Sequence, residues 1–160
     1  DNAQIQNGNF NSPIYSVSTQ AEFGRAYGES IRDGPVQIGK WLNQRTTNSE
    51  KIAVPHAGAM PYYCKCQVIE LGYLNNLNAT HGTLTPSGVL SQEPKYIVLK
   101  FSDEGNVLGQ PINRELYRNS TFQAEYEPVK EVHYVREGFV EYRGERVDGP
   151  YRIYERKASD

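Results

Sequence analysis

The chain has 160 residues, the size of one ordinary domain, and 38% of them are apolar when tyrosine is counted. Its formal net charge of −2 argues against a protein that binds nucleic acid by bulk electrostatics and against a polybasic membrane binder. The longest apolar stretches are a few residues, far short of the roughly 18 that cross a bilayer. We expect no membrane span, and an export signal that is either absent or already removed.

The first residues differ in composition from the rest of the chain. Residues 1–13 are polar and rich in Asn, Gln and Gly, and they end at a proline. Such a segment cannot bury much apolar surface, so we expect a weakly ordered arm there. No large break in composition divides the remainder, which predicts a single domain over residues 14–160.

One segment near the N-terminus, at about residues 19–33, carries clear helix signals. Thr19 and Glu22 make a capping box, and apolar residues follow at the spacing of one helix face. Gly34 and Pro35 predict the end of this helix, because glycine accepts the left-handed backbone of a helix cap and proline cannot continue a helix.

From Val36 onward, apolar residues tend to recur at every second position, which is typical of strands. This spacing predicts a strand at 36–42 and a half-buried strand at 62–68. Cys64 and Cys66 would then point to the same face of the second strand. A disulfide between them would close a very tight and strained loop, so we expect two half-buried thiols, with the disulfide as the alternative.

Further strands are predicted along the rest of the chain. Residues 75–94 look like a long connection that is either functional or contains a short element. Residues 95–101 are the most apolar run and the best candidate for a central strand, and a turn at 103–106 predicts a hairpin after it. Alternating segments, most of them separated by glycine turns, then predict an antiparallel meander at 122–126, 129–135, 139–142 and 151–154.

Together these elements predict a fold that is mainly β to α+β. The one N-terminal helix, at about 19–33, would pack on an antiparallel sheet or on a partly closed barrel. Twelve residues are tyrosines, so part of the core would carry hydroxyl groups that need hydrogen-bond partners.

Common catalytic and metal-binding motifs are missing from the sequence. It has no Gly-x-Ser-x-Gly elbow, no Walker A motif and no dinucleotide fingerprint. The three histidines, His56, His81 and His133, are scattered without the spacing of metal ligands. We therefore expect no metal, and no cofactor outside the NAD-dependent alternative that follows.

Two glutamates two positions apart, Glu125 and Glu127, give the sharpest enzymatic pattern. On an extended segment they would share a face, where one could orient a ribose hydroxyl and the other a nucleophile. The pair resembles the Glu-x-Glu of arginine-directed ADP-ribosyltransferases, whose other parts are an upstream arginine and a Ser-Thr-Ser strand. Ser18 opens a Ser-Thr-Gln segment with no arginine before it, and Arg45 precedes a Thr-Leu-Thr segment at 83–85 that lacks the serines.

This resemblance implies a compact, toxin-like or effector-like enzyme that uses NAD. Its catalytic residues would be the two glutamates together with Ser18 and Arg45. The competing interpretation makes Glu125 and Glu127 ordinary residues on the solvent face of a strand. Whether the chain is an enzyme therefore stays open at the level of the sequence.

The composition favours a different class of function, a small β-rich interaction module. Tyrosine and asparagine are abundant, and tyrosine offers a rigid, amphipathic contact surface at low cost in conformational entropy. We expect such a module to recognise a protein or a glycan, and we expect no nucleic-acid partner. The candidate binding residues are five tyrosines from two parts of the chain: Tyr62, Tyr63, Tyr142, Tyr151 and Tyr154.

Two glycosylation-type triplets are compatible with secretion. They begin at Asn78 and Asn119, and both lie in turn-like surroundings. An extracellular location is therefore slightly favoured, and the two cysteines give no disulfide framework that would settle the compartment.

Overall fold

The computed structural model describes residues 32–72, 81–102, 104–132, 141–142, 145–146 and 150–158. The predicted arm at 1–13, nearly all of the predicted helix at 19–33 and Ser18 lie outside the described residues. The side chain of Tyr142 is also outside the description.

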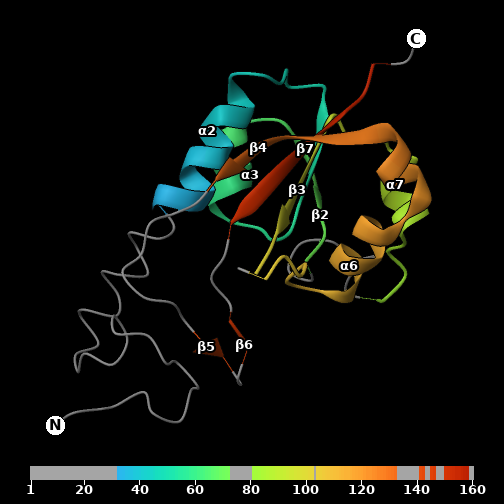
Figure 1. The fold of residues 1–160 in the computed structure, drawn as a ribbon. Coiled ribbons are helices and arrows are strands. Elements are labelled where there is room, and N and C mark those ends of the chain that lie inside the picture. The colour runs from blue at the N-terminus through green and yellow to red at the C-terminus, as the bar shows by residue number, and fades with distance from the viewer. Residues whose placement is uncertain are drawn as a thin grey trace, which may run out of the picture.

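A five-stranded sheet with the order β2-β1-β3-β7-β4 forms the centre of the molecule (Figure 1). Its first three strands run parallel, and β7 lies between β3 and β4 and runs antiparallel to both. The sheet is open, because β2 and β4 are separate edges. The strands are β1 Lys51–Val54, β2 Gln67–Glu70, β3 Tyr96–Lys100, β4 Tyr126–Val132 and β7 Tyr151–Arg156. The fold is therefore α+β, as predicted, with a mixed rather than a purely antiparallel sheet.

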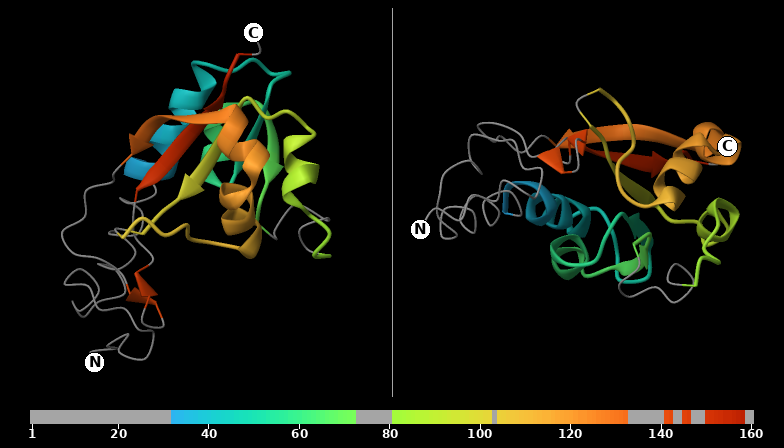
Figure 2. Two further views of the ribbon diagram at one scale, coloured as in Figure 1. Left: turned by 45° about the vertical axis from the view of Figure 1, so that its right-hand side comes forward. Right: turned by 90° about the horizontal axis from the view of Figure 1, so that it is seen from below.

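Helices cover both faces of the sheet (Figures 1 and 2). The helical turn η2 (Arg32–Val36) leads into α2 (Gln37–Asn43), which packs with α3 (Ala59–Cys64) on one side. On the other side lie α5 (Pro86–Leu90), α6 (Pro111–Arg118) and α7 (Ser120–Glu125). A separate two-stranded unit consists of β5 (Glu141–Tyr142) and β6 (Glu145–Arg146).

Each face of the sheet has its own apolar core because side chains alternate along the strands. On β1, Ile52 and Val54 join the core under α2 and α3, whereas Ala53 joins the core under α5, α6 and α7. On β3, Ile97 and Leu99 face the second of these cores. A sheet that is buried on both faces suits parallel strands, which explains the continuous apolar run at 95–101.

The prediction of a strand at 36–42 is wrong. Val36 is the last residue of η2, and the rest of the segment belongs to α2. Ile38 and Leu42 are four residues apart and both fully buried, so they fit one helix face as well as they fit alternation. Gly39 allows α2 to lie against α3, since a Cβ atom there would be 2.8 Å from the Met60 carbonyl oxygen.

The strand expected at 62–68 is wrong in its first half. Helix α3 continues to Cys64, and β2 begins at Gln67. Between them, Lys65 adopts a left-handed backbone with φ of 55° and ends the helix. This turn brings the Cα atoms of Cys64 and Cys66 to 5.3 Å, and the two residues form a disulfide instead of the expected thiols.

The strand expected at 122–126 is also wrong, because residues up to Glu125 belong to α7. Asn119 caps this helix: its Oδ1 accepts hydrogen bonds from the backbone N–H of Thr121 at 2.9 Å and of Phe122 at 3.3 Å. Phe122 and Tyr126 stack at 5.4 Å between ring centroids. This stacking joins the end of α7 to the beginning of β4, because Tyr126 is the first residue of that strand.

Other expectations are confirmed. The run at 95–101 contains β3, the middle strand of the sheet, and the strand expected at 151–154 is β7. Phe101 bridges to Val107 in antiparallel fashion, as the predicted turn required. The long connection at 75–94 contains the short helix α5, whose N-cap Thr85 accepts a hydrogen bond from Gly88.

Candidate functional site

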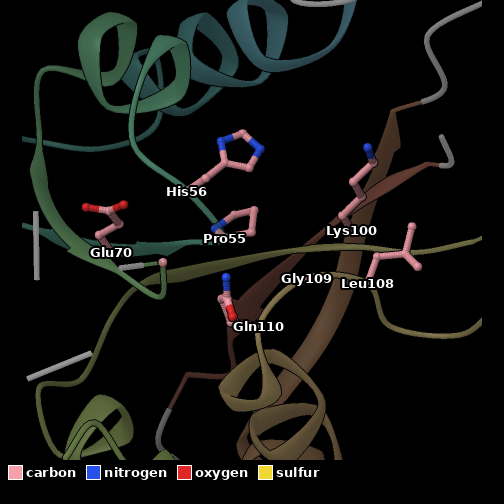
Figure 3. Close-up of a pocket in the computed structure, with 8 residues that line it drawn as sticks. Pro55, His56, Glu70, Lys100, Leu108, Gly109 and Gln110 are labelled. Carbon is pink, nitrogen blue, oxygen red and sulfur yellow. The ribbon is translucent and has the colours of Figure 1, made fainter. Parts of the chain in front are cut away.

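A pocket of about 380 Å³ lies where the three parallel strands end (Figure 3). The chain passes from β1 to β2 on one side of β1 and then to β3 on the other side, which makes the ends of β1 and β3 a topological switch point. In open sheets with parallel strands, ligands bind in the crevice outside the carboxyl ends of the strands at such a point. The pocket is lined by Pro55, His56, Glu70, Gly72, Lys100, Leu108, Gly109 and Gln110.

Glu70, the last residue of β2, supplies the carboxylate of the pocket. Its side chain is almost fully buried, and its Oε1 accepts a hydrogen bond from the backbone N–H of Ala57 at 3.0 Å. Gly72 leaves room for it, since a Cβ atom there would be 3.0 Å from Oε1 and 3.2 Å from the carbonyl oxygen of Pro55. The loops after β1 and β2 are thereby held together around one buried acidic group.

His56 follows β1 and lies half-buried beside the pocket. Its Nδ1 is 3.2 Å from the Ala57 carbonyl oxygen, which can only accept, so Nδ1 carries the proton. Nε2 then accepts from the Tyr151 hydroxyl at 3.1 Å. Burial lowers the pKa of His56 below its ordinary 6.5, and the nearby charge of Lys100 adds to the effect although Ala57 and Glu70 oppose it. The imidazole is therefore neutral at pH 7.

Lys100 and Gln110 complete the polar lining from two further elements. Lys100 ends β3, and its Nζ lies 5.6 Å from the centre of the Tyr151 ring. Gln110 directly precedes α6 and points into the space between the strand ends (Figure 3). The pocket thus combines a carboxylate, an ammonium group, a neutral imidazole and an amide, with Pro55 and Leu108 as apolar walls.

The formal charges of this pocket cancel. Glu70 contributes one negative charge, Lys100 one positive charge, and His56 none. A site of this kind offers hydrogen-bond donors and acceptors without a strong net field, so it suits a neutral polar ligand better than a strongly charged one. In the part of the chain that the structure describes, no cluster of three or more His, Cys, Asp or Glu side chains could hold a metal ion.

The predicted tyrosine residues do not form one surface. Tyr62 and Tyr63 lie on α3 with 76% and 36% of their surface exposed, and their rings are 5.1 Å apart. Tyr151 and Tyr154 are only 3% and 6% exposed, and they belong to the cores on opposite faces of the sheet. Tyr151 contributes to the site indirectly, through its hydrogen bond to His56.

The described residues of the transferase hypothesis lie outside the pocket. Glu125 is the last residue of α7, with its Oε2 3.7 Å from Arg156 Nε, whereas Glu127 is an exposed residue of β4. They belong to a helix and a strand, so the extended segment on which they would share a face does not exist. Arg45 follows α2, and its guanidinium stacks 4.2 Å from the centre of the Trp41 ring. Ser18 is outside the described residues.

Sequence reasoning missed the pocket residues as a group. In the sequence, His56 stands out only as one of three scattered histidines, and no motif marks Glu70, Lys100 or Gln110. A usable signal was present: a polar residue ends or follows each of the short apolar strands β1, β2 and β3. That signal has meaning only if the strands are parallel, because only then do their carboxyl ends meet at one edge.

The profile of a family described as Domain of unknown function (DUF8728) matches residues 20–154. The chain belongs to this family. The match includes every residue that lines the pocket. No curated protein and no solved structure matches this DUF8728 chain. Among the described residues of this DUF8728 chain, no helix has the length and apolar character needed to cross a membrane.

Proposed function

We propose that this DUF8728 chain is a binding module that takes a neutral, hydroxyl-rich ligand of the glycan class in the pocket at the ends of β1, β2 and β3. The observation that carries the proposal is that four unlike polar side chains line one pocket at the switch point. They are Glu70, Lys100, His56 and Gln110, and they come from four separate segments of the chain.

The chemistry of these side chains favours a sugar over other small ligands. A hydroxyl group both donates and accepts hydrogen bonds, so a sugar can use a carboxylate, an ammonium group and an amide at the same time. The cancelled charge gives no advantage to an anion or a cation. Pro55 and Leu108 offer apolar surface for the C–H face of a sugar ring, and the cavity volume of about 380 Å³ falls within the range of small-molecule sites.

Ligand binding with single-residue variants tests this proposal. The probes are D-glucose, D-galactose, D-mannose and N-acetyl-D-glucosamine at millimolar concentration, measured by saturation-transfer NMR and by the shift in melting temperature. We expect at least one sugar to bind, and Glu70→Gln or Lys100→Met to weaken it about tenfold or more, because each removes a charged hydrogen-bonding group of the pocket.

The matched control is Glu127→Gln, which changes an exposed glutamate of β4 outside the pocket. Sugar affinity should be unchanged in this variant. Binding of none of the four sugars would contradict the proposal, and so would an equal loss in Glu127→Gln and Glu70→Gln.

The NAD-dependent alternative stays a prediction, and in the structure its two glutamates lie in different elements, Glu125 in α7 and Glu127 in β4. The same experiment addresses it. A rise in melting temperature on adding NAD that is lost in Glu127→Gln would favour the transferase, and no rise would count against it.

We also propose an oxidising, extracellular environment. Disulfides such as the Cys64–Cys66 bond persist in oxidising compartments and are rare in the cytosol. If alkylation of the protein purified from its natural source, without prior reduction, labels both cysteines, this part of the proposal is wrong.

A further inference from the structure

The Cys64–Cys66 disulfide closes a very small loop, with Lys65 as the only residue between the two cysteines. A disulfide stabilises a fold mainly by restricting the unfolded chain, and this effect is smallest for the shortest loops. Lys65 also has a left-handed backbone, with φ of 55°, which is unfavourable for a residue other than glycine. A purely structural role therefore explains this bond poorly.

The two cysteines differ in their access to solvent. Cys64 is the last residue of α3 and is 1% exposed, whereas Cys66 directly precedes β2 and is partly exposed. A thiolate that attacks a disulfide must reach one sulfur atom, and the other sulfur atom leaves. The difference in burial makes Cys66 the residue that is attacked and Cys64 the leaving group.

The leaving sulfur atom has a hydroxyl group beside it. Thr46 Oγ1 lies 3.6 Å from Cys64 Sγ, and it donates to the Leu42 carbonyl oxygen at 2.8 Å. A hydroxyl proton can rotate, and a charged acceptor forms a stronger hydrogen bond than a neutral one. Thr46 can therefore donate to Cys64 Sγ and stabilise the negative charge that develops there when the disulfide breaks.

We propose that the Cys64–Cys66 disulfide is a redox-active site that oxidises a pair of thiols on a polypeptide. Neither cysteine lines the sugar pocket, so this is a second site. The first substrate thiolate attacks Cys66 Sγ, the Sγ–Sγ bond breaks, and its electron pair goes to Cys64. The second substrate thiolate attacks the substrate sulfur of this mixed disulfide, and Cys66 leaves as a thiolate. The two protons of the substrate thiols end on Cys64 and Cys66, so one dithiol is oxidised while one protein disulfide is reduced.

A dithiol suits this site better than a single thiol such as glutathione. After the first attack, the Cys64 thiolate is close to the mixed disulfide and can reverse the step. A second thiol in the same substrate molecule has a high effective concentration, so it competes with this reversal. A second glutathione molecule would have to arrive from solution.

Exchange with a reduced peptide tests the inference on the full chain. The protein in its disulfide form is mixed with an excess of a peptide that carries two reduced cysteines, and free thiols are alkylated and counted by mass spectrometry. We expect one peptide disulfide and two protein thiols for each chain that reacts, and a rate about tenfold or more lower with glutathione at the same thiol concentration. Equal rates would contradict the dithiol substrate. A protein that keeps its disulfide when folded, but loses it to the same peptide in urea, would contradict the proposal as a whole.

Two matched variants test the roles of the cysteines. Cys64→Ser keeps the partly exposed thiol, and Cys66→Ser keeps the buried one. We expect Cys64→Ser to react with dipyridyl disulfide about tenfold or more faster than Cys66→Ser, and both to react equally fast in urea, where burial no longer protects a thiol. Equal rates without urea would overturn the assignment of the attacked and the leaving sulfur.

The hydroxyl of Thr46 is tested in the protein that keeps both cysteines. Thr46→Val removes the donor with little change in shape, so exchange with the peptide should be slower by about tenfold. Thr46→Ser retains the hydroxyl and should restore the rate, which a loss of packing alone would not predict. An unchanged rate in Thr46→Val would overturn the role of this residue. None of these measurements depends on sugar binding.

Discussion

At the scale of single residues, His56 shows how the surroundings set chemical state. Its Nδ1 donates to a backbone carbonyl and its Nε2 accepts from Tyr151, which fixes one tautomer of the neutral ring. Burial is the main reason for its lowered pKa. His56, which no motif marks in the sequence, is thus a neutral imidazole held in one orientation just after β1.

This protonation equilibrium predicts a pH dependence of stability. The folded state holds the pKa of His56 below the ordinary 6.5, so the unfolded state binds the proton more readily. The free energy of unfolding should therefore be highest above pH 6.5 and decrease as the pH falls below that value. Urea denaturation at pH 7.5 and pH 5.5 measures the difference, which should be smaller in His56→Gln. An equal decrease in both proteins would contradict the assignment.

At the scale of elements, helix caps and close contacts between backbones decide where the short helices near the sheet begin and end. Helix α7 begins where Asn119 supplies an acceptor to two backbone N–H groups, and α3 ends where Lys65 turns left-handed. These devices are local, yet the alternating apolar residues nearby favoured strands in both places. In a segment of only six residues, a capping residue indicates the secondary structure better than the spacing of the apolar residues does.

The cap of α7 can be tested by two substitutions at Asn119. Asn119→Ala removes the acceptor, and we expect it to lower the free energy of unfolding by roughly 0.5–2 kcal/mol. Asn119→Asp keeps an oxygen in place and should cost much less, because aspartate caps helices about as well as asparagine. Both variants also remove the glycosylation triplet, so the comparison is unaffected by a glycan. Chemical denaturation of the unglycosylated proteins gives the values, and equal losses would contradict the capping role.

At the scale of the whole molecule, β7 connects parts of the chain that are far apart in sequence. It pairs with β3 on one side and with β4 on the other. Its side chains serve both cores, with Ile153 and Tyr151 on one face and Tyr154 on the other. The strand that completes the sheet is therefore the last described element of the chain, and it follows all of the described helices in the sequence.

Removal of β7 should consequently abolish the fold. A chain that ends at residue 149 leaves β3 and β4 without their shared partner and loses three large buried side chains. The loss of each buried side chain costs about 2–5 kcal/mol. The three losses together are therefore comparable to the whole free energy of unfolding of a typical domain, about 5–15 kcal/mol. The truncated chain should show the narrow amide dispersion of an unfolded protein in proton NMR. Deletion of residues 159–160 alone is the control and should leave the native spectrum; a native spectrum without β7 would contradict this role.

Some elements of this fold can be predicted from the sequence and others cannot. The α+β class, the central strand at 95–101 and the strand at 151–154 were predictable, since the first strand is the most apolar run of the chain and the second follows a glycine-proline turn. Segments 36–42, 62–64 and 122–125 were not, because their apolar residues fit a period of 2 and a period of 3.6 equally well over so few positions.

The amino-acid sequence by itself determined where apolar surface must be buried and where the backbone must turn, because these depend on neighbouring residues. The tertiary structure alone decided that β1, β2 and β3 run parallel, and with that the meeting of Glu70, Lys100, His56 and Gln110 at one edge. The physical reason is separation: Glu70 lies 14 positions after His56 and Lys100 lies 30 positions after Glu70, so only the crossover connections between the parallel strands bring these three residues together.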